Sequence, residues 1–144
     1  MIKIICVGKI KEKYLREGIE DYIKRIGKYH KLTIIEVDDS EPIEESLKIL
    51  KYVDNKDYVI TLDIEGRELT STELAEKIDK TFITNSNITF IIGGSYGLSN
   101  KIKEISNFTL SFSKLTFPHQ LFRIILLEQI YRSFKILNNE TYHK

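Results

Sequence analysis

The feature that most constrains this chain is a regular alternation of short apolar runs with amphipathic stretches of helical period. The apolar runs have the length and composition of buried strands, and they cover residues 2–7, 33–37, 57–63, 87–92 and 108–112. The other stretches predict helices at about 14–26, 44–51, 70–81, from 100 onward, and 121–137. Strands that alternate with helices predict an α/β fold, with a mostly parallel sheet and helices on both faces.

Two local patterns predict where elements begin and end. The segment Thr70-Ser71-Thr72-Glu73 has the spacing of a capping box, in which the Thr and Glu side chains each bond the other's backbone N–H. It predicts a helix start at this point. The segment Glu65-Gly66-Arg67 follows the third apolar run and predicts a turn that ends that strand.

The composition indicates a single domain spanning residues 1–144, with 42% hydrophobic and 30% charged residues. No apolar run approaches the roughly 20 residues that a membrane-spanning helix needs. The first run is short and charged residues follow it at once, so a signal peptide is not expected. The sequence therefore predicts a soluble, cytoplasmic protein.

Disulfide and metal chemistry are not expected. Cys6 is the only cysteine, so no disulfide can form within the chain, and its place in an apolar run predicts a small core residue. The histidines His30, His119 and His143 are far apart and lack the spacing of metal ligands.

Charge is unevenly distributed along a chain whose net charge is only +1. Residues 1–31 hold nine Lys and Arg against four Asp and Glu, whereas residues 36–68 hold four against eleven. Lys9, Lys11 and their basic neighbours could face the phosphates of a nucleic acid. A solvated helix face explains the same pattern, so charge alone leaves both interpretations open.

Ligands of α/β folds bind beyond the carboxyl ends of parallel strands, which draws attention to the loops after Leu62, Ile92 and Phe112. The second of these loops has the pattern Gly93-Gly94-x-x-Gly97. Glycine lets the backbone approach a ligand closely, but it equally suits a tight turn between a strand and a helix. The pattern therefore predicts either a ligand-binding loop or a tight turn.

The last predicted helix is apolar nearly all round. One broad face holds Ile124, Leu126, Leu127, Ile130, Tyr131, Phe134 and Leu137, and further apolar residues on the other side are Leu121, Phe122, Ile125 and Ile136. Such a helix is buried on more than one side, and in a small domain a second subunit is a natural cover. Arg123 falls near the centre of the broad face. It must meet a carboxylate, a carbonyl, an RNA phosphate or a partner chain, unless it reaches water at the rim.

Five segments in order resemble the ribosomal RNA large subunit methyltransferase H family of the SPOUT class. They are Val7-Gly8-Lys9, Thr61 to Gly66, Ile91 to Leu98, Leu110 to His119, and Tyr142-His143-Lys144. The resemblance covers essentially the whole chain and is most specific at Ser113 to His119 and at the end. It implies a homodimer that uses S-adenosylmethionine to methylate N3 of a pseudouridine, position 1915 of 23S ribosomal RNA, on the assembled ribosome. It also implies a C-terminal trefoil knot, which is too rare for sequence patterns to predict.

The resemblance also implies which residues form the site. The residues matching the cofactor pocket are Leu62, Gly93, Phe112, Ser113, Lys114, Leu115, Thr116 and Phe117. Tyr142, His143 and Lys144 match the substrate-side end of the family, and Arg123 matches a position beside the pocket. We expect Tyr142, His143 and Arg123 to be catalytic and Lys144 to bind RNA, together with Lys9 and Lys11 of the basic cluster. An adenine needs an apolar slot with a few backbone hydrogen bonds, which these residue types can supply. Either His143 or water could take the proton that leaves N3, and no metal is needed.

The chain departs from the family pattern in two places: the connection from Val37 to Tyr58 is short, and Tyr96 occupies a glycine-loop position where other polar residues are common. Two rival functions remain. A receiver-like signalling domain would use the acidic pair Asp38-Asp39 with Lys114, but a receiver needs that pair after its first strand. A non-catalytic ribosome-binding relative would lack an intact cofactor pocket.

Overall fold

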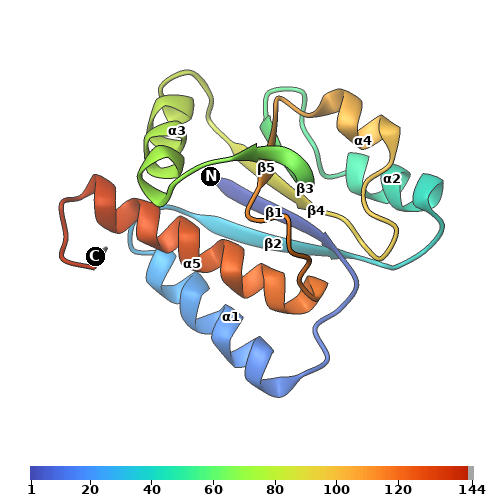
Figure 1. Cartoon of the computed structure of the whole chain (residues 1–144), viewed down its shortest axis with the longest axis horizontal. Helices are drawn as coiled ribbons and strands as arrows, with labels where there is room; N and C mark the ends of the chain where they lie inside the picture. Colours follow the sequence, from blue (N-terminus) through green and yellow to red (C-terminus); the bar gives the residue numbers. More distant parts are fainter. Residues whose placement is uncertain (143–144) are drawn as a thin grey trace.

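The computed structural model describes residues 1–142, in which strands and helices alternate along the chain (Figure 1). The strands are β1 (Ile2–Val7), β2 (Leu32–Val37), β3 (Tyr58–Glu68), β4 (Ile88–Ile92) and β5 (Phe108–Ser111). The helices are α1 (Lys13–Ile26), α2 (Pro42–Leu50), α3 (Ser71–Thr84), α4 (Asn100–Ile105) and α5 (His119–Leu137). His143 and Lys144 lie outside the described residues.

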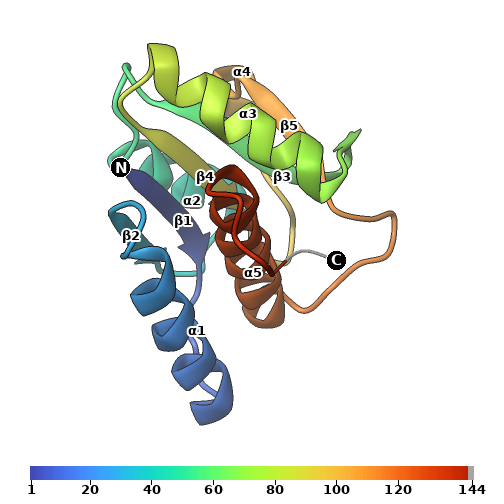
Figure 2. The same ribbon diagram turned by 90° about the vertical axis from the view of Figure 1, so that its left-hand side faces the viewer.

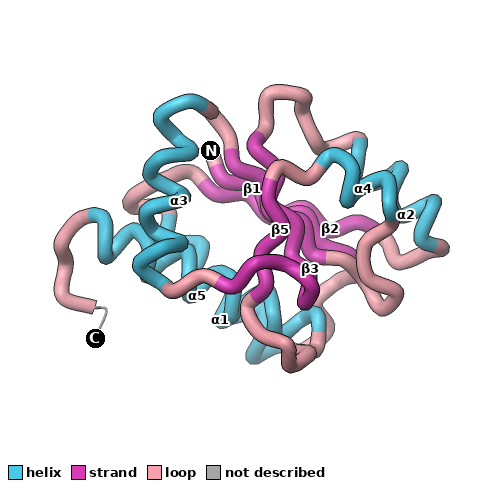
Figure 3. The backbone as a smooth tube through the Cα atoms, turned by 45° about the horizontal axis from the view of Figure 1, so that its top comes forward, coloured by secondary structure: helices cyan, strands magenta, loops and turns pink. Residues whose placement is uncertain are grey.

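The strands form one sheet in the order β2-β1-β4-β3-β5, and every neighbouring pair is parallel. Helices α1, α3 and α5 lie on one face of the sheet, and α2 and α4 lie on the other (Figure 3). Every residue of the inner strand β1 is buried, because it has strands on both sides and helices on both faces. The predicted α/β fold is confirmed.

Alternate residues of β1 supply two separate cores. Ile2 and Ile4 pack in the larger core beneath α1, α3 and α5, whereas Ile5 and Val7 pack in the smaller core on the opposite face. Helix α5 contacts both α1 and α3, so it lies between them over the larger core (Figure 2). Cys6 is fully buried in this core, and burial raises the pKa of its thiol to about 12. The expectation of a core cysteine is confirmed.

The turn predicted at Glu65-Gly66-Arg67 is wrong, because β3 continues through it to Glu68. The pairing of β3 with β5 shifts register between Leu62 and Arg67, so the strand bends at this point instead of ending. Gly66 lies so close to β5 that a Cβ at this position would be 2.7 Å from the carbonyl oxygen of Thr109. A glycine is therefore required at this position for β3 to pack closely against β5.

The capping box predicted before α3 is confirmed. The Thr70 side chain accepts a hydrogen bond from the Glu73 N–H at 3.1 Å, and the Glu73 carboxylate accepts one from the Thr70 N–H at 2.8 Å. This reciprocal pair satisfies two backbone donors that the first turn of a helix leaves without partners. The start of α3 is fixed where β3 ends, close to the carboxyl edge of the sheet.

Candidate functional site

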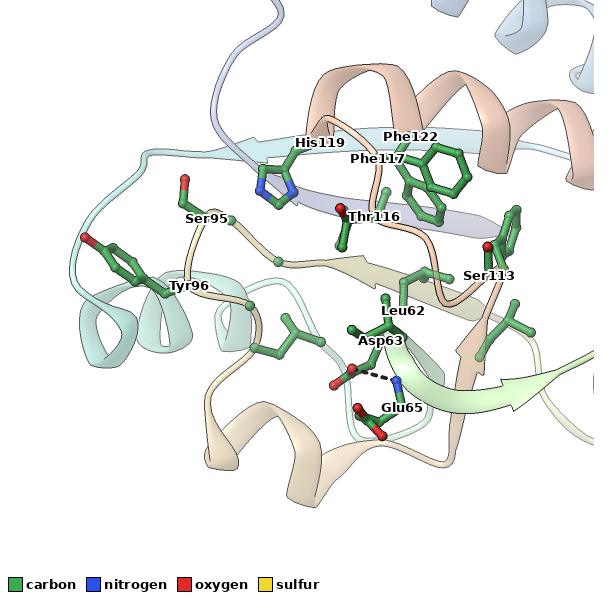
Figure 4. Close-up of a pocket in the computed structure, with 18 of the residues that line it drawn as sticks. Leu62, Asp63, Glu65, Ser95, Tyr96, Ser113, Thr116, Phe117, His119 and Phe122 are labelled. Carbon is green, nitrogen blue, oxygen red and sulfur yellow. Dashed lines mark hydrogen bonds between the residues drawn. The ribbon is translucent and has the colours of Figure 1, made fainter.

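A pocket of about 480 Å³ opens at the carboxyl ends of β3, β4 and β5 (Figure 4). Because β3 pairs with both β4 and β5, the second half of β3 and the loops after β4 and β5 lie side by side. The first wall of the pocket comes from residues 62–65 of β3, the second from 92–98 after β4, and the third from 110–122 after β5. The segments after Leu62, Ile92 and Phe112 therefore meet at one cavity, although the first of them is part of β3 and not a loop.

The glycine loop after β4 forms a tight turn that also lines the pocket. The Gly97 N–H donates to the Gly94 carbonyl at 3.0 Å, and Gly97 has a φ of 72°, a left-handed conformation that favours glycine. A Cβ on Gly93 would lie 2.8 Å from the backbone of Gly97. Both interpretations of the glycine pattern fit this loop, because a turn this tight exposes backbone to the cavity.

An apolar wall closes the opposite side of the pocket. The Phe112 and Phe122 rings meet edge to face with centroids 5.0 Å apart, and the Phe117 ring stacks on Phe122 at 5.9 Å. Leu62 and Leu110 complete this surface. Figure 4 shows Phe117 and Phe122 together above Leu62. Such a slot suits a flat aromatic ligand, because ring pairs at these separations are favourable.

Hydrogen bonds shape the polar rim of the pocket. The Ser113 hydroxyl accepts from the Leu115 N–H at 3.0 Å, which fixes the turn after β5. On the facing rim, the Asp63 carboxylate accepts from the Glu65 N–H at 3.1 Å and lies 3.7 Å from the Lys103 ammonium. The rim therefore presents two carboxylates from β3 beside an apolar slot.

Seven of the eight predicted cofactor-binding residues line this pocket: Leu62, Gly93, Phe112, Ser113, Leu115, Thr116 and Phe117. Lys114 is exposed and is not among the lining residues. Sequence reasoning missed Asp63, Glu65, Lys103, His119 and Phe122, which also line the cavity. The position of Asp63 and Glu65 just after Leu62 could have indicated the first two, but nothing local to Lys103 points to the pocket.

Arg123 lies beside the pocket and is 1% exposed. Its Nη1 bonds Oε2 of Glu36 at 2.5 Å, and its Nη2 donates to the carbonyl oxygens of Val7 at 3.0 Å and Gly8 at 2.7 Å. The guanidinium thus meets a carboxylate and two carbonyls, and the alternative of escape to water is wrong. Arg123 ties the first turn of α5 to the ends of β1 and β2. Its predicted catalytic role stays a prediction, since the pocket is lined by its neighbours His119 and Phe122.

Tyr142 follows α5, packs against it, and does not line the pocket of its own chain. Its hydroxyl donates to Oε2 of Glu128 at 2.9 Å, and its ring meets Tyr131 edge to face at 5.0 Å. Burial, followed by this hydrogen bond, raises the pKa of Tyr142 above its usual value. The catalytic and RNA-binding roles predicted for His143 and Lys144 fall on residues outside the described part of the chain.

Lys9 and Lys11 are exposed in the loop between β1 and α1. This loop is held beside the start of α5, because the Lys11 N–H donates to Oε1 of Gln120 at 3.2 Å. The Ile10 N–H donates to Oε2 of Glu36, the carboxylate that also binds Arg123. The backbone of this loop therefore lies beside the start of α5, and the contact of both lysines with RNA stays a prediction.

Within residues 1–142, no group of three or more His, Cys, Asp or Glu side chains could hold a metal ion. In the same part of the chain, no helix combines the length and the apolarity needed to cross a bilayer.

Known proteins resemble this chain over its whole length. The family described as "Predicted SPOUT methyltransferase" matches residues 1–143. A ribosomal RNA large subunit methyltransferase H of Clostridium botulinum strain Hall is 50% identical over 157 aligned positions, which cover 99% of each chain. A Methanococcus maripaludis strain C5 protein, provisionally given the same name, is 57% identical with the same coverage. The alignments are longer than this chain of 144 residues, so these relatives carry residues without a counterpart here.

A solved structure shares the fold. The probable methylase family protein from Haemophilus influenzae Rd KW20 superposes with a TM-score of 0.59 at 16% identity, covering 99% of this chain and 70% of that one. Its likeness supports the arrangement of strands and helices, while the identities above determine the family. The receiver-like alternative is thereby excluded. This chain belongs to the SPOUT methyltransferases, in the family of the ribosomal RNA large subunit methyltransferase H proteins, and its methyl donor is S-adenosylmethionine.

Proposed function

We propose that this protein methylates N3 of a pseudouridine in 23S ribosomal RNA, at the position, 1915, that the family resemblance implies. The observation that carries the proposal is the convergence of β3 and the loops after β4 and β5 on one pocket, in a chain 50% identical to a ribosomal RNA large subunit methyltransferase H. The pocket is of the size of small-molecule sites, which range over about 300–1,000 Å³. Its place at the carboxyl edge of a parallel sheet is where such folds bind ligands.

The residues present fit S-adenosylmethionine. The apolar wall of Phe112, Phe117 and Leu62 suits an adenine, and the exposed backbone of the glycine loop can bond to its edge. The carboxylates of Asp63 and Glu65 lie on the rim, where they complement a cationic ligand. When bound, this cofactor supplies an activated methyl group. Of the predicted cofactor-binding residues, Lys114 alone lies outside the pocket lining, and its cofactor-binding role stays a prediction.

The protein's contribution to methyl transfer is alignment and removal of a proton. The nucleophilic nitrogen must approach the methyl carbon in line with the bond that breaks, so holding both partners accounts for a large part of the rate. The N3 proton must leave, and His143 is the side chain proposed to accept it because the unperturbed pKa of histidine is about 6.5. Lys9, Lys11 and Lys144 are proposed to bind the RNA phosphates, and Arg123 is proposed to act in catalysis from its place beside the pocket.

The active site is proposed to form between two copies of the chain. Helix α5 covers the larger core and still leaves Leu121 exposed and Phe122 and Ile125 partly exposed. A second copy covering this helix would explain its unusual apolar character. Because Tyr142 does not line its own pocket, we propose that residues 142–144 complete the pocket of the partner subunit. The C-terminal knot that the resemblance implies is part of the same proposal.

The substrate is proposed to be the assembled ribosome, within the cytoplasm. A net charge of +1 gives little non-specific attraction for RNA, whose backbone is bound mainly through counterion release by Lys and Arg. Specificity must then come from shape and from a composite surface. Equal turnover on a short naked hairpin and on intact ribosomes would contradict this part of the proposal.

The experiment that tests the function is mass mapping of 23S ribosomal RNA from a strain that lacks this gene. We expect one methyl group to disappear from one pseudouridine, and purified protein with S-adenosylmethionine to restore it on ribosomes from that strain. An unchanged methylation map would contradict the proposal. Binding to ribosomes without methyl transfer would instead support the non-catalytic alternative.

A further inference from the structure

The chain reverses direction after α5 through a defined turn (Figure 1). The Asn139 N–H donates to the Ile136 carbonyl at 3.1 Å, and the Glu140 N–H donates to the Lys135 carbonyl at 3.0 Å. Asn139 has a φ of 55°, the left-handed conformation typical of the residue that follows a helix. These features form a Schellman motif, which ends a helix and sends the chain back along it. Tyr142 is thereby directed toward α5.

One carboxylate receives the returning tail. Oε2 of Glu128 accepts hydrogen bonds from the hydroxyl of Tyr22 on α1 at 2.8 Å and from the hydroxyl of Tyr142 at 2.9 Å. Oε1 accepts from Nε and Nη2 of Arg132 at 2.9 and 2.7 Å. Glu128 thus joins α1, α5 and the tail. One of its carboxylate oxygens binds the two tyrosines, and the other binds the arginine. We call Tyr22, Glu128, Arg132 and Tyr142 the tail anchor.

The ring of Tyr142 is held as well as its hydroxyl. It meets the edge of the buried Tyr131 ring at 5.0 Å, and the Arg132 guanidinium carbon lies 4.9 Å from its centroid. Burial and the Glu128 carboxylate raise the pKa values of both Tyr22 and Tyr142, so both hydroxyls remain protonated donors at neutral pH. Tyr142 is therefore placed as a fixed support and not as a proton acceptor.

We propose that Glu128 is a positioning residue, which anchors Tyr142 against α5 and so fixes where the described part of the tail ends. This inference rests on the proposed function of the tail at the active site. A free tail would have to be ordered each time substrate binds, and a preorganised one avoids that entropic cost. Loss of the anchor should therefore weaken RNA use while leaving the distant cofactor pocket intact, because none of the anchor residues lines it.

The test compares Glu128→Gln and Tyr142→Phe with Glu76→Gln, a matched charge removal at an exposed position of α3. The first readout is the rate at which carboxypeptidase releases residues from the C-terminus of the full chain. Hydrogen bonds to charged groups are worth about 1.5–3 kcal/mol, so release should accelerate roughly tenfold or more in the two anchor variants. Release in Glu76→Gln should match the wild type.

The second readout separates positioning from general damage. We expect the KM for ribosomes to rise roughly tenfold in Glu128→Gln, with the calorimetric affinity for S-adenosylmethionine close to that of the wild type and the protein still folded at the assay temperature. Tyr142→Phe, which loses a single hydroxyl, should show the same pattern more weakly. Unchanged carboxypeptidase release in both variants would overturn the anchor, whatever the protein methylates. Faster release with an unchanged KM and kcat would overturn the positioning role, and the proposed function would stand in either case.

Discussion

The Nη1 atom of Arg123, in the first turn of α5, lies 2.5 Å from Oε2 of Glu36 on β2. The two residues are 87 positions apart in the chain, and the same guanidinium also bonds the carbonyls of Val7 and Gly8 at the end of β1. One buried cation therefore joins the helix that borders the pocket to two strands of the sheet. Its neighbours His119 and Phe122 line the cavity, so this junction sets where one wall of the pocket stands.

Replacement of Arg123 by Leu should destabilise the protein by about 2–4 kcal/mol, because Glu36 and two backbone carbonyls would lose their donor. Arg123→Lys should recover part of this loss, since an ammonium can bond some of these oxygens but lacks the planar fork. Urea unfolding of both variants measures the difference. A Leu variant as stable as the wild type would contradict the structural role of Arg123. The predicted catalytic role would then be the only role left for this residue.

Replacement of Gly93 by Val should abolish binding of S-adenosylmethionine. A Cβ at this position would lie 2.8 Å from the Gly97 backbone, so a valine would displace the glycine loop and occupy part of the pocket. Isothermal calorimetry with Ile83→Ala, an exposed change on α3, as a control measures the effect. Wild-type affinity in the folded Gly93→Val protein would show that the cofactor binds elsewhere.

Acid should destabilise the protein partly through Asp57, whose side chain is fully buried and lies 2.5 Å from the Lys3 ammonium. Burial alone would raise the pKa of this carboxyl, but bonds from Lys3, the Asp54 N–H, Asn87 and Thr89 outweigh it and lower the pKa below its ordinary 3.8. A lowered pKa in the folded state contributes stability above about pH 4, and that contribution is lost as the pH falls below it.

Asp57→Asn should therefore cost about 3 kcal/mol at pH 7, because Lys3 loses its ion-pair partner in a buried setting. Its stability should also fall less steeply than that of the wild type between pH 4 and acid unfolding. Urea midpoints measured across this range provide the check. Parallel curves for the two proteins would mean that Asp57 has no depressed pKa in the folded state.

The sequence predicted the order of elements because each strand and helix carries its own periodicity, as in the apolar run at Ile2 and the capping box at Thr70. It failed at Gly66, where a glycine that usually marks a turn instead permits close packing of β3 on β5. It also could not identify Glu36 as the partner of Arg123, or Glu128 as the partner of Tyr142 and Tyr22. Such pairings depend on how elements far apart in the sequence pack together, and no local sequence pattern predicts them. The site residues were found through family resemblance, which identified Leu62 and Gly93 but not the adjacent Asp63 and Glu65.

The protein should be a stable homodimer. Sedimentation at micromolar concentration should give about twice the chain mass of 16.9 kDa. Charged substitutions at Leu121, which is 39% exposed on α5, should shift the equilibrium toward monomer if this helix forms the interface. A wild-type monomer with full methyltransferase activity would contradict the shared site.

Mixed dimers test whether the tail serves the opposite subunit. One subunit ends at Thr141 and keeps its pocket, and the other carries Gly93→Val and keeps its tail. Each homodimer should be inactive, because the first lacks tails and the second lacks usable pockets. If tails act across the interface, the mixed dimer has one complete site, formed by the first pocket and the second tail. Random pairing would then restore about one quarter of wild-type activity, since half of the dimers are mixed and each has one site of two. If tails act within their own chain, neither site of the mixed dimer is complete. Verified mixed dimers without methyl transfer would therefore reject the shared site, while calorimetry on the first subunit would still report the cofactor pocket.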